Sequence, residues 1–406
     1  MKSLGIRVAL YVNYFVFAIL LNTVGIVILQ VINDYIVNRV TAGSLEAYKD
    51  FSIMILSFFV ASYIPKLGYK RSMLGGLFAV SLISIIVALV HHYWIVPLLY
   101  IVTGASFAFI KVSVYSTVGL ITKSQKEHTS FMNILEGVFQ IGSLVGPIIF
   151  SFMIGFSKWT DTYWIIAILT SLALLLMFVT NLNESSIKSN VEKTNILSML
   201  KLLKKSAVWL FVICAFLYVM IEQSLNTWLP TFNKETFNLT ESQTAALLAF
   251  YPGSIALSRL LAGYYSKYIS WLKSQLILLS GAFIIIATVL FLTSDYHLTQ
   301  STMSNNFPPL AIIILFTGFF IGPIYPTIVS IILNKTEKVK QSSMTGLIVV
   351  FSALGGTSGS LIIGFLSQNY SVHTAFYFPL IPITLLGMLL FPYKKLTDKL
   401  SNEAVN

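Results

Sequence analysis

The chain has 406 residues, of which 56% are hydrophobic, 14% are aromatic and only 10% are charged, and its net charge is +11. A typical soluble domain has about 25% charged residues, so this composition excludes an ordinary soluble globular protein and indicates an all-α membrane protein. The single cysteine, Cys214, excludes an intrachain disulfide, and the five histidines show no spacing typical of metal ligands. We therefore expect neither a metal nor a cofactor.

A membrane-spanning helix needs about 20 mostly apolar residues. Segments of this kind recur along the whole chain, which predicts twelve transmembrane helices. The first of them lacks a small-residue cleavage site, so we interpret it as a spanning helix and not as a signal peptide. The predicted helices cover roughly residues 7–31, 50–65, 72–92, 95–121, 130–156, 162–182, 207–231, 242–266, 274–294, 307–333, 342–366 and 373–393.

The positive charges are distributed unevenly between the two ends of these segments. Most of the 26 lysines and arginines lie at the ends that share one side, as Lys70, Arg71 and Lys126 do. Cytoplasmic loops of membrane proteins carry such an excess. We expect a multi-pass protein of the cell (inner) membrane, surrounded by lipid, with both termini cytoplasmic. The positive charge therefore encodes topology and gives no evidence for a nucleic-acid partner.

The longest polar segment divides the chain into two halves of six helices. We predict a helical bundle over residues 1–182, a cytoplasmic linker over 183–206 and a second bundle over 207–406. The sequences IGSLVGP (141–147) and LGGTSGS (354–360) occupy equivalent places in the two halves, and each contains a Gly-xxx-Gly pair that lets helices approach closely. Two pseudo-symmetric six-helix bundles with substrate bound near the midplane resemble the major facilitator fold.

Several stretches also resemble the fucose–proton symporter family. They are LYVMIEQSLNTWLPTF (217–232), SRLLAGYYSKYISWLK (258–273), YPTIVS (325–330) and GLIVVFSALGGTSGSLIIGF (346–365). The resemblance implies proton-coupled sugar transport. It also implies a substrate contact for Asn22, which fits the family pattern in the first helix. Gly25 stands where the family has an Asp, and Lys111 lies at or next to the position of a family Glu.

A carboxylic acid interrupts the seventh predicted helix. Burying a carboxylate in hydrocarbon is costly, so such residues are rare and usually functional. Tyr218, Glu222 and Asn226 recur every four residues and therefore share one face of the helix. We predict that Glu222 couples transport to protons, the alternative being a protonated Glu hydrogen-bonded to a neighbouring helix. Tyr218, Gln223 and Asn226 are predicted substrate contacts. Trp228 fits either an interfacial aromatic belt or a stacking platform for substrate.

The N-terminal half has a second set of candidates. Lys111 in the fourth helix and Glu136 in the fifth lie at similar depths, so they could form an ion pair, or Lys111 could contact an anionic ligand. Tyr115 shares the face of Lys111, and Gln140 shares the face of Glu136. We predict Lys111, Tyr115 and Gln140 as substrate contacts and Glu136 as a second candidate for proton coupling.

In the tenth helix, Pro323 and Pro326 lie on either side of Tyr325. Proline removes a backbone donor, which frees a carbonyl group to face a cavity, and this makes Tyr325 a predicted substrate contact. Arg259 in the eighth helix lies near the cytoplasmic end, and we interpret it as structural.

No nucleotide-binding loop or nucleophile motif occurs in the sequence, so we expect neither an enzyme nor an ATP-driven pump. The predicted function is secondary active transport of a small polar solute, a sugar or sugar-like metabolite, by alternating access and coupled to protons. One alternative is a proton-driven exporter of a metabolite, siderophore or drug; another is a carrier of an anionic or carboxylate substrate. A membrane sensor or scaffold that transports nothing is a further alternative. The expected partners are a small-molecule substrate and a proton, and we expect a monomer.

Overall fold

The computed structural model describes residues 2–122, 125–182, 184, 203–265, 268–294, 308–334 and 338–403. Within these ranges the chain is helical almost throughout, and 11 of the described helical stretches are long and apolar enough to cross a membrane. The remaining predicted segment, 50–65, lies in α3 (Arg39–Leu67), which is itself 29 residues long. The predicted all-α membrane fold is therefore confirmed.

The chain forms two compact units. Unit 1 consists of Met1–Ile36 and Leu45–Thr194, and unit 2 consists of Val37–Ser44 and Asn195–Asn406. The first residues of α3 are thus counted with unit 2. Most of the predicted linker, 183–206, lies outside the described residues.

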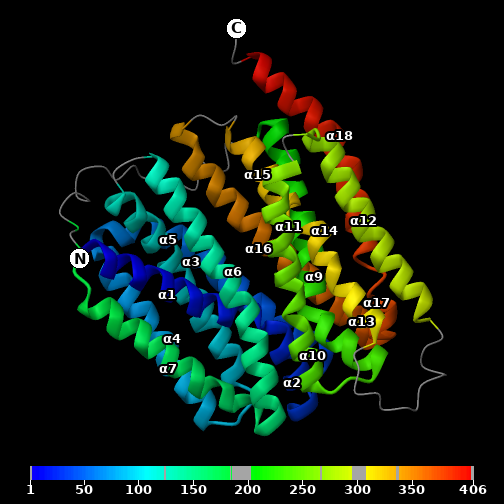
Figure 1. Ribbon diagram of the computed structural model, residues 1–406, viewed down its shortest axis with the longest axis horizontal. Helices are drawn as coiled ribbons and strands as arrows, with labels where there is room; N and C mark the ends of the chain where they lie inside the picture. The colour runs from blue at the N-terminus through cyan, green and yellow to red at the C-terminus, as the bar shows by residue number, and fades with distance from the viewer. Residues whose placement is uncertain are drawn as a thin grey trace. The chain divides into compact units, whose positions relative to one another are not determined.

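In unit 1, α1 lies against α6, and α4 lies against both α5 and α7 (Figure 1). The long apolar stretches of these helices explain why they bury one another. Besides α3, its helices are α1 (Lys2–Asn22), α2 (Val24–Tyr35), α4 (Tyr69–Leu89), α5 (Ile95–Ile121), α6 (Gln125–Phe156), η1 (Trp159–Asp161) and α7 (Thr162–Val179).

Unit 2 is centred on α9, a helix of 32 residues that packs against α16, α18, α15 and α10. In Figure 1, α9 and α16 run side by side. The helices of unit 2 are α9 (Ser206–Phe237), α10 (Glu241–Leu248), α11 (Phe250–Tyr265), α12 (Trp271–Leu292), α13 (Pro309–Ile313), η4 (Ile314–Phe316), α14 (Thr317–Ile321), α15 (Ile324–Asn334), α16 (Lys338–Asn369), α17 (Val372–Ala375) and α18 (Leu380–Glu403).

Glycines make the main helix packing of unit 1 possible. A Cβ atom at Gly142 of α6 would lie 2.5 Å from the carbonyl oxygen of Phe15 and 2.7 Å from the Cβ of Ala18, both in α1. A Cβ at Gly146 would lie 2.8 Å from Thr23 Cγ2. Only a residue without a side chain fits at these distances, so the Gly-xxx-Gly pair allows the close helix approach that the sequence predicts, and the partner of α6 is α1.

The equivalent glycines of unit 2 act in the same way. A Cβ at Gly355 of α16 would collide with the carbonyl oxygen of Phe216 in α9, and one at Gly359 would lie 2.5 Å from the carbonyl oxygen of Met220. Helix α16 therefore packs through its glycines directly against the stretch of α9 that carries Tyr218 and Glu222.

We expect alanine to have opposite effects at two glycines of α6. Gly142→Ala should lower the free energy of unfolding by roughly 1–3 kcal/mol, because the new methyl group overpacks the contact with α1. Gly137→Ala is the matched control, since a Cβ there has open space within 4 Å. It should stabilise the helix by about 0.5–1 kcal/mol. The free energy of unfolding in detergent is measured for both variants. Equal changes at the two positions would contradict the close packing of Gly142 against α1.

Candidate functional site

The candidate site in unit 2 begins on α9. The side chain of Glu222 is 23% exposed, and one turn away Tyr218 is buried with 1% exposure. The spacing that the sequence shows therefore places a carboxyl and a phenol on the same part of one helix. Asn226 lies one further turn along and is half-buried, as is the neighbouring Gln223.

Arg259 on α11 is the cation that faces Glu222. Its Nη2 atom lies 4.0 Å from Glu222 Oε1, and its side chain is 33% exposed. The Nε–H of the same guanidinium donates a hydrogen bond of 3.1 Å to the carbonyl oxygen of Gly322. The contact between the two charges is a loose ion pair, whereas the contact of Arg259 with the backbone is a regular hydrogen bond.

The carbonyl of Gly322 is available because of a proline four residues later. In an α-helix the carbonyl of residue 322 would accept the N–H of residue 326, but residue 326 is Pro326 and has no N–H. The helix is interrupted at this point, between α14 and α15. Thus the predicted freeing of a carbonyl by a proline does occur, and an arginine side chain supplies the missing donor.

Small residues bring α14 close enough to α11 for this hydrogen bond. A Cβ atom at Gly322 would lie 3.0 Å from the carbonyl oxygen of Ile255, and one at Gly318 would lie 2.7 Å from that of Tyr251. Because Ile255 and Tyr251 precede Arg259 by one and two turns of α11, this close approach places Gly322 beside the guanidinium.

Three tyrosines surround the charged pair. The rings of Tyr218 and Tyr325 are stacked, with centroids 5.3 Å apart and planes inclined by 24°. The Tyr325 hydroxyl lies 3.1 Å from the Ser352 hydroxyl, and Tyr251 donates a hydrogen bond of 3.3 Å to the backbone carbonyl of Glu222. The buried hydroxyl of Tyr218 makes no hydrogen bond of good geometry, and Glu222 and Arg259 are the charged groups that act on it.

The Tyr218 hydroxyl interacts with both charged groups without a hydrogen bond of good geometry, so it can also donate to or accept from an added molecule. The same place offers a carboxyl, a guanidinium and an aromatic face. Such a set can exchange a proton, bind an anion or stack on a ring.

Trp228 lies on α9 but apart from these groups. Its ring is completely buried, its Nε1–H donates a hydrogen bond of 3.0 Å to the carbonyl of Ser360, and Cβ atoms at Gly43 and Gly364 would lie 3.2 and 3.1 Å from the ring atom Cζ2. This placement favours a packing role for Trp228 over the belt or the stacking platform that the sequence suggested.

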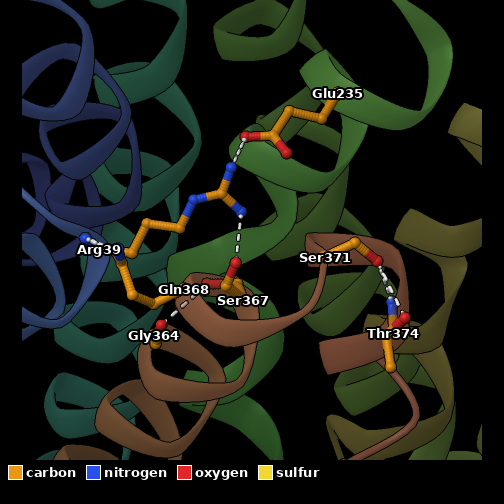
Figure 2. A network of polar contacts seen from close by, with 7 residues as sticks. All are labelled: Arg39, Glu235, Gly364, Ser367, Gln368, Ser371 and Thr374. Carbon is orange, nitrogen blue, oxygen red and sulfur yellow. Dashed lines mark hydrogen bonds and ion pairs between the residues drawn. The ribbon is translucent and has the colours of Figure 1, made fainter.

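A charged network near the end of α9 holds the first residues of α3 within unit 2 (Figure 2). Arg39 Nη2 lies 2.7 Å from Glu235 Oε1, and Nη1 donates a hydrogen bond of 3.2 Å to the carbonyl of Ser367. The backbone N–H of Arg39 donates a hydrogen bond of 2.8 Å to Gln368 Oε1. The guanidinium therefore ties the first residues of α3, which belong to unit 2, to both α9 and α16.

The candidate site in unit 1 is mainly aromatic. Tyr14 of α1 is buried, and its ring lies 6.1 Å from that of Tyr115 and 5.4 Å from that of Phe139. The Lys111 ammonium lies 5.8 Å from the ring centroid of Phe107 and 6.0 Å from that of Tyr115. These distances are typical of cation–π contacts.

The suggested ion pair between Lys111 and Glu136 is not formed within 4.0 Å in the described part of the chain. Tyr115 instead donates a hydrogen bond of 2.6 Å to Glu136 Oε1. The physical reason is that a phenol from α5 reaches the carboxylate while the ammonium lies over the faces of two rings. This arrangement leaves Lys111 available for a ligand.

The two other predicted contacts of unit 1 occupy different places. Asn22 ends α1, and its Nδ2 donates a hydrogen bond of 2.9 Å to the carbonyl of Ala18. Thr23 follows at the break between α1 and α2, so the predicted single helix over 7–31 is interrupted there. Gln140 is half-buried on α6, one turn from Glu136.

Sequence reasoning missed a buried charged cluster in α3. Lys49, which directly precedes the predicted span 50–65, lies between Glu46 and Asp50 in the interior of unit 1. The signal that could have identified it is the spacing of three and four residues, which places these side chains on one helix face.

Comparisons with known proteins agree with this architecture. A model of the Major Facilitator Superfamily matches residues 10–300 and 296–405. A TsgA homolog from Buchnera aphidicola subsp. Baizongia pistaciae is 21% identical over 92% of this chain and 91% of its own length. Multidrug resistance protein 2 of Bacillus subtilis is 24% identical over 83% of this chain and 82% of its own length.

Solved transporters share the fold. A bacterial homolog of the human lysosomal transporter Spinster has a TM-score of 0.78 with 10% identity, and covers 98% of both chains. The transporter FucP in its outward conformation has a TM-score of 0.62 with 15% identity, over 97% of this chain and 99% of its own. The predicted major facilitator fold is confirmed, whereas the narrower resemblance to fucose–proton symporters is not. With the 11 described helices able to cross a membrane, the family match establishes an integral multi-pass membrane protein.

We expect Glu136 to be coupled energetically to Tyr115 and not directly to Lys111. In a double-mutant cycle, Tyr115→Phe and Glu136→Gln should show a coupling of about 0.5–1.5 kcal/mol in the free energy of unfolding, because they remove the two ends of one hydrogen bond. The cycle of Lys111→Met with Glu136→Gln is the comparison and should show a smaller coupling. A larger coupling energy between Lys111 and Glu136 than between Tyr115 and Glu136 would instead indicate a direct ion pair.

Proposed function

We propose, from the premise that the chain belongs to the Major Facilitator Superfamily, that it moves a small polar solute by alternating access and couples this movement to protons. The family and its solved neighbours point to a transporter and not to an enzyme. We propose further that the protein lies in the cell (inner) membrane as a monomer, with both termini cytoplasmic, as the charge distribution favours.

The observation that carries the proposal is the pair of contacts made by Arg259. Its Nε–H is held by the Gly322 carbonyl at 3.1 Å, while its Nη2 lies only loosely against Glu222, at 4.0 Å. The guanidinium is thus positioned by the backbone and does not need the carboxylate to stay in place. Glu222 can gain or lose a proton without displacing Arg259.

Protonation of Glu222 would change what Arg259 can bind. An ionised Glu222 competes for the guanidinium, whereas a protonated Glu222 leaves its donors to a solute. Solute and proton would then bind cooperatively, since linkage requires each to raise the affinity for the other by the same factor. Coupling requires such a difference in affinity, because a ligand that binds two states equally does not shift the equilibrium between them.

A sugar or sugar-like solute suits the rest of the site. The stacked rings of Tyr218 and Tyr325 offer an apolar face, and the buried Tyr218 hydroxyl lies beside Glu222 and Arg259. Asn226 and Gln223 on the same helix would add amide donors and acceptors. Sugars present both ring faces and hydroxyl groups, so this combination of aromatic and polar contacts matches them.

A carrier of an anionic solute, or an exporter, is the second candidate. The Lys111 ammonium lies over two aromatic rings and pairs with no described carboxylate within 4.0 Å, which favours a ligand with an acidic group and a flat surface. A relative of 24% identity, Multidrug resistance protein 2, also carries a name that suggests export. Asn22, Tyr115 and Gln140 would complete such a site in unit 1, with Glu136 as the alternative residue for proton coupling.

We expect Glu222→Gln to separate solute binding from proton coupling. A thermal-shift screen against monosaccharides, nucleosides and organic acids would first identify a solute that raises the unfolding temperature. In proteoliposomes, the variant should exchange this solute between the two sides but fail to accumulate it against a gradient. Its solute affinity should no longer fall as the pH rises, because Gln resembles the protonated carboxyl at every pH.

The matched control is Glu241→Gln, which neutralises a carboxylate paired with Lys234 at the start of α10. It should accumulate solute as the wild type does. If Glu222→Gln accumulates solute normally with an unchanged pH profile, the proton binds elsewhere, and Glu136→Gln becomes the variant to measure.

A further inference from the structure

The site in unit 2 contains one positive and one negative side chain, and these two face each other. Arg259 Nη2 lies 4.0 Å from Glu222 Oε1, and both residues lie in stretches long and apolar enough to cross a membrane. Arg259 makes no other ion pair within 4.0 Å in the described part of the chain. With both groups ionised, the pair carries no net charge.

Protonation of Glu222 leaves the charge of Arg259 unbalanced. The guanidinium then keeps the Gly322 carbonyl at 3.1 Å, but this acceptor is neutral. A single charge that is isolated from water inside a membrane protein is costly. A neutral sugar would leave the site with a charge of +1, whereas a solute with one negative charge makes it neutral. The protonated site therefore favours a monoanion.

The other titratable groups beside Glu222 among the described residues are phenols. They are Tyr218 on α9, Tyr251 on α11 and Tyr325 on α15. From α16, Ser352 contributes a hydroxyl that does not titrate near neutral pH. Phenols are uncharged at neutral pH, so none of these groups balances Arg259 when Glu222 is protonated. The balancing charge has to come from the solute.

The guanidinium of Arg259 selects the kind of anion. Its Nε–H is used by the Gly322 carbonyl, which leaves the Nη1 and Nη2 groups for Glu222, Tyr218 and a solute. Guanidinium and carboxylate are both planar and form two parallel N–H···O bonds. A phosphate group carries a charge of about −1.5 to −2 near pH 7 and would make the site negative. The geometry and the charge therefore both favour a carboxylate.

The rest of the solute is set by the aromatic and polar groups around this pair. The ring of Tyr325 is half-buried and is stacked on that of Tyr218, with centroids 5.3 Å apart. Ser352 places a hydroxyl 3.1 Å from the Tyr325 hydroxyl, and Asn226 on α9 adds an amide. An apolar ring face bordered by such polar groups matches the face and the hydroxyls of a sugar ring.

On the basis of the proposed proton-coupling role of Glu222, we propose that the site in unit 2 binds a sugar acid with one carboxylate, a uronate, together with one proton. The carboxylate of the solute takes the place of Glu222 beside Arg259, and the proton resides on Glu222. The site is then neutral both when it is empty, with Glu222 ionised, and when it is loaded. The anion and the proton together also move no net charge.

Binding to the purified full chain tests the choice of solute. Isothermal titration calorimetry at mildly acidic pH compares D-glucuronate and D-galacturonate with D-glucose and D-galactose. We expect at least one uronate to bind about tenfold or more tightly than its neutral sugar, because a charge-assisted pair replaces a neutral contact. Glucose 6-phosphate should bind more weakly than that uronate. Equal affinities for uronate and sugar, or no binding of either uronate, would overturn the proposal.

Variants test whether Arg259 is responsible for the preference. Glu222→Gln keeps the guanidinium without its competing carboxylate, so the uronate preference should no longer fall as the pH rises. Glu222→Gln combined with Arg259→Gln strands no charge, so this chain should fold and bind uronate and neutral sugar equally. Arg259→Lys keeps the charge without the planar group and should keep only part of the preference. Glu241→Gln, at the pair with Lys234, is the control and should behave as the wild type. A preference that survives in the double variant would place the carboxylate elsewhere and overturn the proposal.

The response of transport to membrane potential separates this proposal from the proposed function. In proteoliposomes, a pH gradient should drive uronate uptake, and a potential imposed with K⁺ and valinomycin should leave its rate unchanged. Uptake that responds to both the pH gradient and the potential would keep proton coupling but overturn the pairing of one proton with a monoanion. Uptake that ignores the pH gradient would overturn proton coupling, while a uronate preference lost in the double variant would still establish the carboxylate site at Arg259.

Discussion

The candidate site of unit 2 depends on one hydrogen bond, from the Arg259 Nε–H to the Gly322 carbonyl. That carbonyl has no helical donor because Pro326 has no N–H. A guanidinium in the interior of a membrane protein needs fixed acceptors, and the backbone supplies one here without a second charge. Arg259 therefore faces Glu222 at 4.0 Å without forming a tight ion pair with it, and in our proposal this loose contact lets the carboxyl exchange a proton.

The fold could be predicted from the sequence almost completely. The apolar lengths identify the helices, and the two Gly-xxx-Gly pairs predict that α6 and α16 each approach another helix closely; the structure shows that these partners are α1 and α9. The length of an apolar run and the absence of a side chain at glycine can both be read directly from the sequence. They have the same consequence for the structure whatever the other helices do. The break at Thr23 was less visible, because a helix that is interrupted inside an apolar run keeps its composition, whereas Pro323 and Pro326 indicated the break at Gly322.

The candidate site could be predicted only in part. The four-residue spacing placed Tyr218 and Glu222 together, but it could not show that Arg259 faces them, since that depends on how close α11 lies to α14. The hydrogen bond of Tyr115 to Glu136 displaces the expected contact with Lys111 for a similar reason. Trp228 is buried because Gly43 and Gly364 make room for its ring, and these residues are distant from it in sequence. Partners across helices are set by tertiary contacts, which periodicity does not encode.

The most direct test of this account is to return the missing N–H to the helix and measure proton movement. Solute-induced proton uptake into proteoliposomes would be compared for Pro326→Ala and Pro323→Ala. An N–H at residue 326 competes for the Gly322 carbonyl, whereas one at residue 323 is directed at the carbonyl of Phe319. The account predicts that Pro326→Ala loses most of the proton uptake and that Pro323→Ala retains it. Equal proton uptake by the two variants would contradict the claim that the freed carbonyl positions Arg259 for coupling.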